Sequence, residues 1–255
     1  MLLELLDVRR TFGGLAAVDG ASLAVGAGEV HGLIGPNGAG KTTLLNLISG
    51  LIPATSGSIR LDGVRLDGLP SHRIAALGVT RTYQNIRLFP ALTAADNVLV
   101  GAHLKRHAPL WRRMLFLPSA AIEERGARQA SLALLARVGM AERAQERASN
   151  LSYGEQRRVE IARALASTPR VMLLDEPTAG MNPGEVASIA ELIRGVARAG
   201  HSVLLVEHNV KLVMAVCDRI TVLDFGKVIA DGTPAEVAND PAVIAAYLGG
   251  GEAAA

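Results

Sequence analysis

Short apolar runs mark the predicted strands of this chain, at residues 3–6, 30–34, 171–174, 203–206 and 220–223. The last three runs are almost continuously apolar, which is typical of strands buried on both faces of a mostly parallel sheet. Helical patterns follow at 42–49 and at 183–198, and the second opens with Asn182-Pro183, a cap residue and a first-turn proline. This order of strand, loop and helix predicts an α/β domain.

The middle of the chain follows a different pattern. From about 90 to 163 no run favours a strand, whereas 93–100 and 122–138 carry apolar residues at helical spacing. Residues 101–119 are basic and apolar and hold the only tryptophan. We therefore expect a helical subdomain at about 90–165, inserted into a domain of about 1–250, with a frayed tail at 251–255.

Composition narrows the class of protein. The chain is 49% hydrophobic and 20% charged, which is a globular composition, and its net charge of +2 is too small to indicate a nucleic-acid partner. The single cysteine, Cys217, indicates a reducing compartment and is expected to be a small buried hydrophobic residue. The start MLLELLDVRR lacks the basic region of a signal peptide, and no apolar run reaches the roughly 18 residues of a membrane helix, so we expect a soluble protein.

The stretch GPNGAGKTTL, residues 35–44, directly follows an apolar run. Gly35-x-x-x-x-Gly40-Lys41-Thr42 fits the phosphate-binding loop, with a strand before it and a helix after it. Glycines let backbone N–H groups turn toward a phosphate, and a helix N-terminus adds partial positive charge. Lys41 is expected to reach the β- and γ-phosphates and the Thr42 hydroxyl to ligate Mg²⁺. The expected nucleotide contacts in this loop are Gly35, Pro36, Asn37, Gly38, Ala39, Gly40, Lys41, Thr42 and Thr43.

The apolar run 171–174 ends in two carboxylates, Asp175 and Glu176. The carboxyl edge of an open α/β sheet is where ligands bind. We expect Asp175 to hold Mg²⁺ and Glu176 to orient and activate the attacking water. Strands often end in an acidic residue, so this run alone would be weak evidence for a catalytic site. It becomes strong evidence because the same chain carries a phosphate-binding loop.

A third segment, LSYGEQRR at 151–158, precedes a helix that runs to about residue 167. Ser152 fits an N-cap and Glu155 closes a capping box. A helix N-terminus with Ser152 and Gly154 is also an anion site, so both interpretations stand at this point.

With these motifs in order, the chain resembles the ATP-binding subunits of ABC transporters, whose signature is L-S-G-G-Q, over about residues 1–248. The resemblance implies an ABC nucleotide-binding domain with a mostly parallel core sheet, an antiparallel β part and an inserted helical subdomain. It also implies a transport-coupled ATPase that uses ATP and Mg²⁺, with Glu176, His208 and Lys41 as its catalytic residues.

Further roles follow from the resemblance alone. Phe12, before Gly13-Gly14, falls at the position of the aromatic residue that stacks on adenine, with a core phenylalanine as the alternative. Gln84 matches the glutamine that senses Mg²⁺ beside the membrane-domain contact, and His208 matches the histidine that contacts the γ-phosphate. The other five histidines have no such context and are treated as surface or space-filling residues.

The resemblance also implies that two cassettes sandwich two ATP molecules. Ser152, Gly154 and Glu155 would then act on the nucleotide of the partner, and residues 179–182 would link the two sites. The signature departs from the general one, because Tyr153 and Glu155 replace Gly and Gln. Asn182 also stands where many cassettes carry Asp, and Phe12 replaces the commoner Tyr.

Several longer segments resemble most the ATP-binding proteins of branched-chain amino acid importers. They are LSYGEQRRVEIARAL, DEPTAGMNPGE, RTYQNIRLFPALTAADNV and the ending CDRITVLDFGKVIADGTPAEVANDPAVIAAYLG. This resemblance implies a second cassette (a copy or a homologue), membrane permeases, indirectly a substrate-binding protein, no nucleic acid, and a peripheral place on the cytoplasmic face of the inner membrane. We expect Trp111, Arg112, Arg113 and Phe116 to form or flank the surface that meets the permease or the headgroups, with a solvated loop as the alternative.

Three other functions compete with the importer. Cassettes for lipopolysaccharide export and urea uptake share much of the same pattern. Soluble cassettes that act on nucleic acid or ribosomes usually need two cassettes in one chain, a long coiled coil or a strong basic face. A nucleotide-binding regulator that does not hydrolyse ATP is disfavoured by Glu176 and His208.

Overall fold

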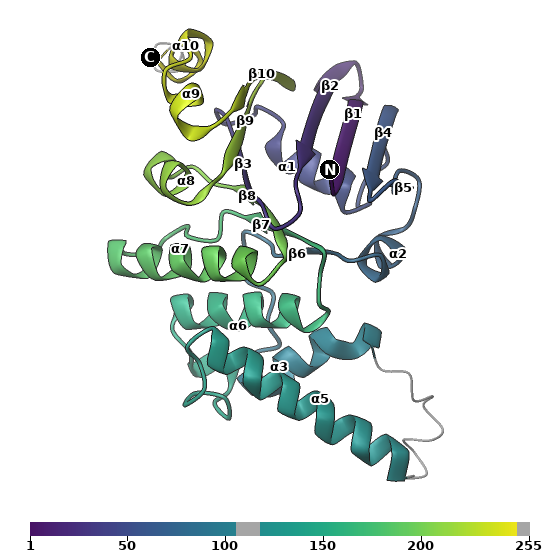
Figure 1. The fold of residues 1–255 in the computed structure, drawn as a ribbon, viewed down its shortest axis with the longest axis vertical. Helices are drawn as coiled ribbons and strands as arrows, with labels where there is room; N and C mark the ends of the chain where they lie inside the picture. The colour runs from purple at the N-terminus through teal and green to yellow at the C-terminus, as the bar shows by residue number, and fades with distance from the viewer. Residues whose placement is uncertain (106–117, 249–255) are drawn as a thin grey trace. The chain divides into compact units, whose positions relative to one another are not determined.

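The structure is a computed structural model that describes residues 1–105 and 118–248 (Figure 1). The chain divides into two compact units, the first of Met1–Arg81 with Arg170–Ala255 and the second of Thr82–Pro169. The expected permease-facing residues Trp111, Arg112, Arg113 and Phe116 and the tail 251–255 lie outside the described residues.

A six-stranded sheet forms the centre of the first unit, in the order β10-β9-β3-β8-β7-β6. Five strands are parallel and β10 at the edge is antiparallel, as expected for a mostly parallel core. The central strands β3, β7 and β8 are buried at every residue, which explains their unbroken apolar sequence. The strands are β3 (Val30–Ile34), β6 (Val79–Arg81), β7 (Val171–Asp175), β8 (Ser202–Val206), β9 (Arg219–Asp224) and β10 (Lys227–Gly232).

A four-stranded antiparallel sheet, β2-β1-β4-β5, forms the other layer of this unit. It consists of β1 (Leu3–Phe12), β2 (Leu15–Val25), β4 (Ser56–Leu61) and β5 (Val64–Arg65), with α2 (Ser71–Ala76) next in the chain. Helix α1 (Lys41–Ile48) lies between the two sheets in Figure 1. Its apolar residues Leu44, Leu45 and Ile48 share one core cluster with residues of both sheets. The start of α1 is therefore fixed by packing on two sides.

Four further helices lie on the opposite side of the six-stranded sheet from α1 (Figure 1). They are α7 (Pro183–Arg198), α8 (Val210–Val216), α9 (Pro234–Ala238) and α10 (Pro241–Leu248). Helix α7 has the predicted bounds, because Asn182 caps it and forms a capping box with Glu185. Cys217 after α8 is buried, and this burial raises the pKa of its thiol to about 12, as fits an inert packing residue.

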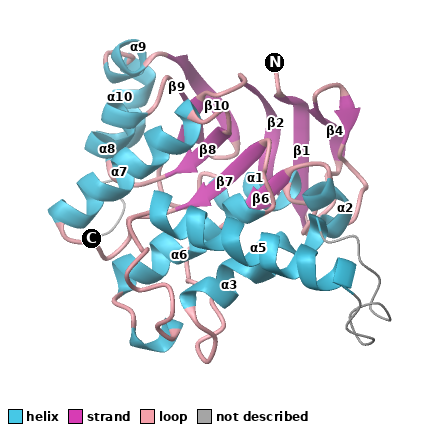
Figure 2. Ribbon diagram, turned by 60° about the horizontal axis from the view of Figure 1, so that its bottom comes forward, coloured by secondary structure: helices cyan, strands magenta, loops and turns pink. Residues whose placement is uncertain are grey.

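The regular elements of the second unit, in its described part, are helices joined by loops. It contains α3 (Ala94–Gly101), η1 (Ala102–Lys105), α5 (Pro118–Arg137), η2 (Ala148–Asn150) and α6 (Tyr153–Ala166). Helices α3, α5 and α6 pack against one another (Figure 2). At the start of α6 the Ser152 N–H donates to Glu155 Oε2 at 2.8 Å, and the Glu155 N–H donates to Ser152 Oγ at 3.4 Å. The predicted capping box is therefore present.

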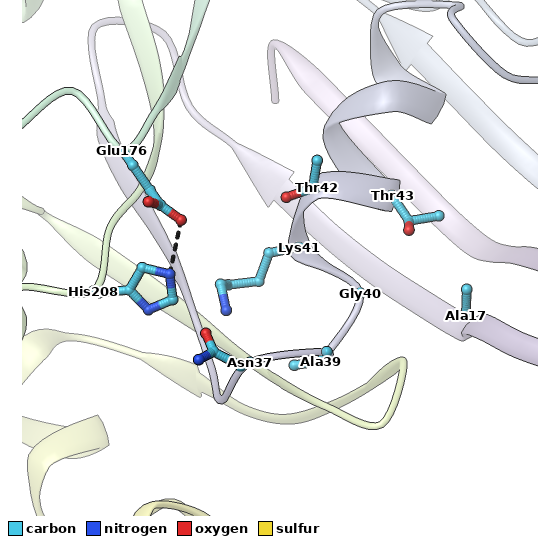
Figure 3. Close-up of a pocket in the computed structure, with 10 residues that line it drawn as sticks. Ala17, Asn37, Ala39, Gly40, Lys41, Thr42, Thr43, Glu176 and His208 are labelled. Carbon is cyan, nitrogen blue, oxygen red and sulfur yellow. Dashed lines mark hydrogen bonds and ion pairs between the residues drawn. The ribbon is translucent and has the colours of Figure 1, made fainter. Parts of the chain in front are cut away.

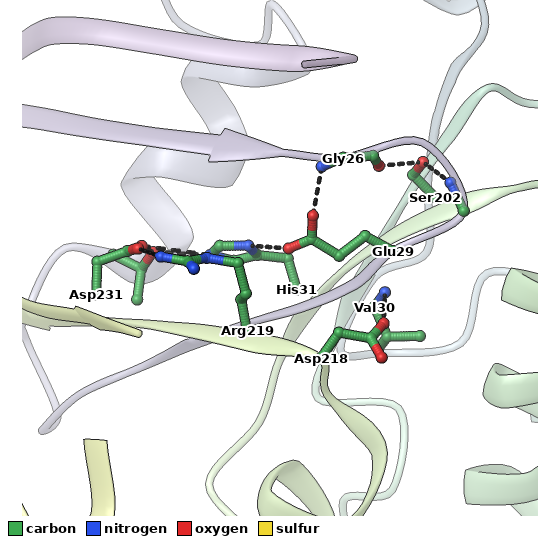
Figure 4. Close-up of polar contacts among 10 residues, drawn as sticks. Gly26, Glu29, Val30, His31, Ser202, Asp218, Arg219 and Asp231 are labelled. Carbon is green, nitrogen blue, oxygen red and sulfur yellow. Dashed lines mark hydrogen bonds and ion pairs between the residues drawn. The ribbon is translucent and has the colours of Figure 1, made fainter. Parts of the chain in front are cut away.

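A buried polar network joins β3, which leads into the phosphate loop, to β9 and β10 (Figure 4). The fully buried His31 lies with Nδ1 2.8 Å from Glu29 Oε1 and Nε2 2.7 Å from Thr221 Oγ. Because the Thr221 hydroxyl donates to Asp231, its oxygen must accept from His31. His31 therefore has a hydrogen-bond partner on each of its two ring nitrogens. His31 is thus not a surface residue, and besides filling space in the interior it makes specific polar contacts.

We find no helix within residues 1–105 and 118–248 that has the length and apolar character needed to cross a membrane.

Candidate nucleotide-binding site

The phosphate loop, Glu176 and His208 line one pocket of about 210 Å³ (Figure 3). Its walls come from β2, from the loop before α1 and the first turn of α1, and from the loops that follow β7 and β8. The lining residues are Ala17, Asn37, Gly38, Ala39, Gly40, Lys41, Thr42, Thr43, Glu176 and His208. Of these, only Ala17 was not among the residues expected from the sequence.

Two glycines of the loop are required by close backbone contacts. A Cβ atom on Gly35 would lie 2.0 Å from the Leu223 carbonyl oxygen, and one on Gly40 would lie 2.4 Å from that of Ala17. Gly40 also has a φ of 100°, in the left-handed region that favours glycine. The loop is thus held between β9 and β2, and the first N–H groups of α1 are left without intrahelical partners at the pocket.

Among the described residues, Lys41 is the one lysine or arginine that lines this pocket. Its Nζ donates to the carbonyl oxygens of Gly35 at 2.7 Å and Pro36 at 2.8 Å. Burial lowers the pKa of Lys41, while the carboxylates of Glu176 and Asp175 act in the opposite direction. A partly desolvated ammonium held inside the loop is well suited to bind a phosphate as a point charge.

Glu176 and His208 form a pair across the pocket, with Nε2 2.7 Å from Oε1 (Figure 3). Parallel pairing of β7 with β8 brings them together, because Asp175 lies opposite Val206. Glu176 has a φ of 45°, a conformation that costs free energy for a non-glycine residue. Its N–H donates to the Val206 carbonyl at 2.9 Å, which helps to hold that conformation. In this geometry the His208 imidazole orients the Glu176 carboxylate through a hydrogen bond.

Asp175 is buried beside the site but does not line the pocket. Its Oδ2 accepts from Arg81 Nη2 at 2.8 Å, and Arg81 Nη1 donates to Asn46 Oδ1 of α1 at 2.6 Å. Within the described residues, no group of three His, Cys, Asp or Glu side chains could hold a metal by itself. Mg²⁺ bound to a nucleotide usually takes one or two protein oxygens together with phosphates and water. The Thr42 hydroxyl lines the pocket and fits this role, and the role of Asp175 as a second ligand stays a prediction.

Phe12 lies at the end of β1 and is not among the pocket residues. Its side chain is 44% exposed, so the alternative of a core phenylalanine is wrong. The Arg10 guanidinium carbon lies 4.4 Å from the centre of the Phe12 ring, and Arg10 Nη1 donates to the Pro53 carbonyl at 3.0 Å. The ring is therefore braced from one side and still accessible to a ligand.

The remaining expected residues, Gln84, Ser152, Gly154 and Glu155, belong to the second unit. There the fully buried Arg157 of α6 donates to the carbonyl oxygens of Tyr83 and Gln84, both at 2.7 Å. Arg157 also pairs with the buried Glu160. This arginine holds the segment around Gln84 to the signature helix, and its role was not predicted because the contacts join residues more than 70 positions apart.

The chain matches the family model described as "ABC transporter" over residues 18–179, which is more than half of its length. It therefore belongs to the ABC transporter family of ATP-binding proteins, and it is an ABC-type ATPase that binds nucleotide. Residues 227–253 match a second model, "Branched-chain amino acid ATP-binding cassette transporter".

A curated relative and two solved structures agree with this assignment. The high-affinity branched-chain amino acid transport ATP-binding protein BraF of Pseudomonas aeruginosa is 44% identical over 250 residues, 97% of this chain and 98% of that protein. An ABC transporter cassette solved in its ADP conformation matches with a TM-score of 0.84 and 29% identity over 97% of this chain and 98% of that one. A dimeric cassette bound to ADP and Pi matches with a TM-score of 0.76 and 26% identity over 91% of this chain and 99% of that one.

Proposed function

We propose that this chain is the ATP-hydrolysing subunit that powers import of branched-chain or related amino acids through a membrane ABC transporter. The observation that carries the ATPase part is the pocket that joins the phosphate loop to the Glu176–His208 pair. The substrate class is supported by the match at residues 227–253 and by the likeness to BraF.

The pocket residues divide the work of phosphoryl transfer between them. The N–H groups of the phosphate loop and the Lys41 ammonium bind the β- and γ-phosphates and stabilise the charge that develops there. Glu176 orients the attacking water and accepts its proton, and His208 holds that carboxylate and contacts the γ-phosphate. Thr42 and Asp175 would hold Mg²⁺, which would supply charge neutralisation on the phosphate oxygens. Phe12 binds the adenine by stacking.

A second cassette completes the site in this proposal. The chain has one phosphate loop and one signature segment, and one of its structural relatives is a dimeric cassette. Ser152, Gly154 and Glu155 would contact the nucleotide held by the partner and close it off from water. The pair of cassettes would bind membrane permeases on the cytoplasmic face of the inner membrane, with a substrate-binding protein on the other side.

Co-purification tests this function most broadly. A Glu176→Gln variant, which is expected to bind ATP without hydrolysing it, is used with ATP to capture partners from solubilised source membranes. Lys41→Ala, which is expected to bind ATP poorly, serves as the control. We expect two polytopic permeases and a second cassette. Reconstituted with a substrate-binding protein, the assembly should take up labelled leucine, isoleucine or valine in an ATP-dependent way.

Other outcomes would change the proposal at defined points. Recovery of lipopolysaccharide-export components, or uptake of urea in place of amino acids, would be consistent with the ATPase activity but would contradict the proposed substrate class. Recovery of ribosomes or DNA-bound proteins without permeases would contradict the proposal that the chain takes part in transport.

A further inference from the structure

A buried carboxylate, Glu207, directly precedes the pocket residue His208 in the chain and has no role in the function described so far. It follows the last residue of β8 and is only 4% exposed. Burial of an ionised carboxylate is costly unless hydrogen bonds replace its water. The contacts of Glu207 therefore decide what it can do.

The two oxygens of Glu207 contact two different loops. Oε1 accepts from the Thr178 N–H at 2.9 Å and from the Thr178 hydroxyl at 2.6 Å. Oε2 accepts from the His208 N–H at 3.1 Å and, more weakly, from the Asn209 N–H at 3.5 Å. Among the ion pairs of the described residues, none includes Glu207. The carboxylate is held by N–H and O–H donors of the chain, and these donors fix both loops to it.

The two loops are the ones that carry the Glu176–His208 pair. Thr178 lies two residues after Glu176, and His208 is the next residue after Glu207. Glu176 is held at a φ of 45°. Strained residues keep their conformation only where their surroundings over-determine it. Hydrogen bonds that pin Thr178 on one side and His208 on the other supply such a constraint.

We propose that Glu207 is a positioning residue for ATP hydrolysis. Through its hydrogen bonds to Thr178 and to the His208 N–H, it fixes the position of the Glu176 loop relative to the His208 loop. The inference rests on the proposed function, because it assumes that Glu176 and His208 act in hydrolysis. Thr178 is also directly followed by residues 179–182, the segment expected to link the two sites of a dimer. The same carboxylate thus connects that segment to the hydrolytic pair.

The test compares Glu207→Gln with Thr178→Val in the chain assembled with its transport partners. Glutamine keeps the size but turns an NH₂ group toward one set of donors, and valine removes the hydroxyl of Thr178 at nearly constant shape. We expect each variant to lose about 10- to 100-fold in kcat, the effect of a small displacement of catalytic groups. ATP affinity should change by less than about threefold, because the phosphate loop is untouched.

Controls separate positioning from a loss of fold. Thr178→Ser keeps the hydroxyl and should restore most of kcat to the wild-type value. Glu191→Gln changes an exposed glutamate of α7, 65% accessible, and should change neither kcat nor the thermal midpoint. Added to Glu176→Gln, the Glu207→Gln change should cause no further loss, since both act on the same step.

Two results would overturn the inference. One is a kcat within about twofold of wild type in both Glu207→Gln and Thr178→Val. The other is a parallel loss of kcat, ATP affinity and thermal midpoint, which would make Glu207 a purely structural residue. Failure of the proposed function would look different, because wild-type protein would then lack ATPase activity or Glu176→Gln would retain it.

Discussion

At the scale of single residues, the pocket depends on a few side chains held in costly arrangements. Lys41 is desolvated inside its own loop, and Glu176 keeps a left-handed backbone. Such costs persist where the surrounding structure enforces them, and they concentrate at sites that do chemistry. Substitution of a residue at this site should therefore change nucleotide binding or hydrolysis in a direction that can be stated in advance.

Lys41→Ala should abolish ATP turnover. Within residues 1–105 and 118–248, no other lysine or arginine lines the pocket. ATP affinity should fall about 10- to 100-fold, because hydrogen bonds between charged groups contribute about 1.5–3 kcal/mol. Steady-state turnover and equilibrium binding of ATP measure the two effects. Lys227→Ala, at a lysine 66% exposed, is the matched control and should behave as wild type. Turnover that survives in Lys41→Ala would contradict the assignment of the phosphate loop.

Phe12→Ala should weaken binding of ATP more than binding of inorganic tripolyphosphate. Loss of base stacking costs about 1–3 kcal/mol, or about 5- to 100-fold in the dissociation constant of ATP. Tripolyphosphate has no base, so its affinity should stay the same. Phe12→Tyr keeps a ring on the Arg10 guanidinium and should retain most of the affinity for ATP. An equal loss for both ligands would mean that Phe12 supports the fold and does not touch the base.

At the scale of secondary-structure elements, the strand that carries the phosphate loop is tied to its neighbours by charge as well as by packing. His31 of β3 lies between Glu29 and the Thr221–Asp231 pair on β9 and β10. Burial raises the pKa of Glu29, but hydrogen bonds from His31 and the Gly26 N–H outweigh it, so that the pKa lies below its ordinary value. The pKa of Asp231 is lowered in the same way. Burial raises it, but hydrogen bonds from Thr221 and Arg219 and the charge of nearby groups, including His31, outweigh that effect.

Depressed carboxyl pKa values give a stability that is lost in acid. Above the ordinary carboxyl pKa of about 4, both groups are ionised whether or not the chain is folded, and the network contributes fully. As the pH falls through the lower native values, protonation removes that contribution. We expect Glu29→Gln to destabilise the protein at pH 7 by about 1–3 kcal/mol.

Urea unfolding at neutral and acid pH measures this effect. Because Glu29→Gln has already lost part of the network, its stability should fall less than that of wild type between neutral pH and about pH 3. Glu191→Gln, on the surface of α7, should follow the wild-type curve at both pH values. An identical pH dependence in wild type and Glu29→Gln would show that the carboxylate contributes nothing to acid stability.

The elements that sequence could predict are those with a strong local signal. Strands β3, β7 and β8 were predictable because both faces are buried, and α7 because Asn182, Pro183 and Glu185 mark its start. Strands β2, β4 and β10 were not, since each mixes buried and exposed residues without a clear alternation. Their pairing depends on partners far away in the chain.

The same contrast holds within the site. The phosphate loop, Glu176 and His208 were predictable from motifs, because local spacing fixes their chemistry. Glu207 and Arg81 were not, because their roles come from contacts with Thr178, 29 residues away, and Asp175, 94 residues away. Local sequence carries no sign of a hydrogen bond between two loops.

At the scale of the whole molecule, one chain contributes two different parts to nucleotide binding. The first unit holds the pocket, and the second holds the capped signature helix α6. In a dimer of cassettes these two parts would serve different nucleotides, so hydrolysis would depend on assembly. ATP turnover should therefore rise more than linearly with the concentration of isolated chain, and become independent of concentration once permeases hold two cassettes together.

The measurement that tests the central claim most directly is the identity of the nucleotide retained by Glu176→Gln. The variant and the wild type, each assembled with its partners, are incubated with Mg²⁺ and radiolabelled ATP, freed of unbound ligand and analysed for ATP and ADP. If Glu176 activates the attacking water, the variant retains intact ATP while the wild type retains ADP. ADP on the variant, formed at a rate close to that of the wild type, would contradict the role of Glu176 and with it the mechanism built on this pocket.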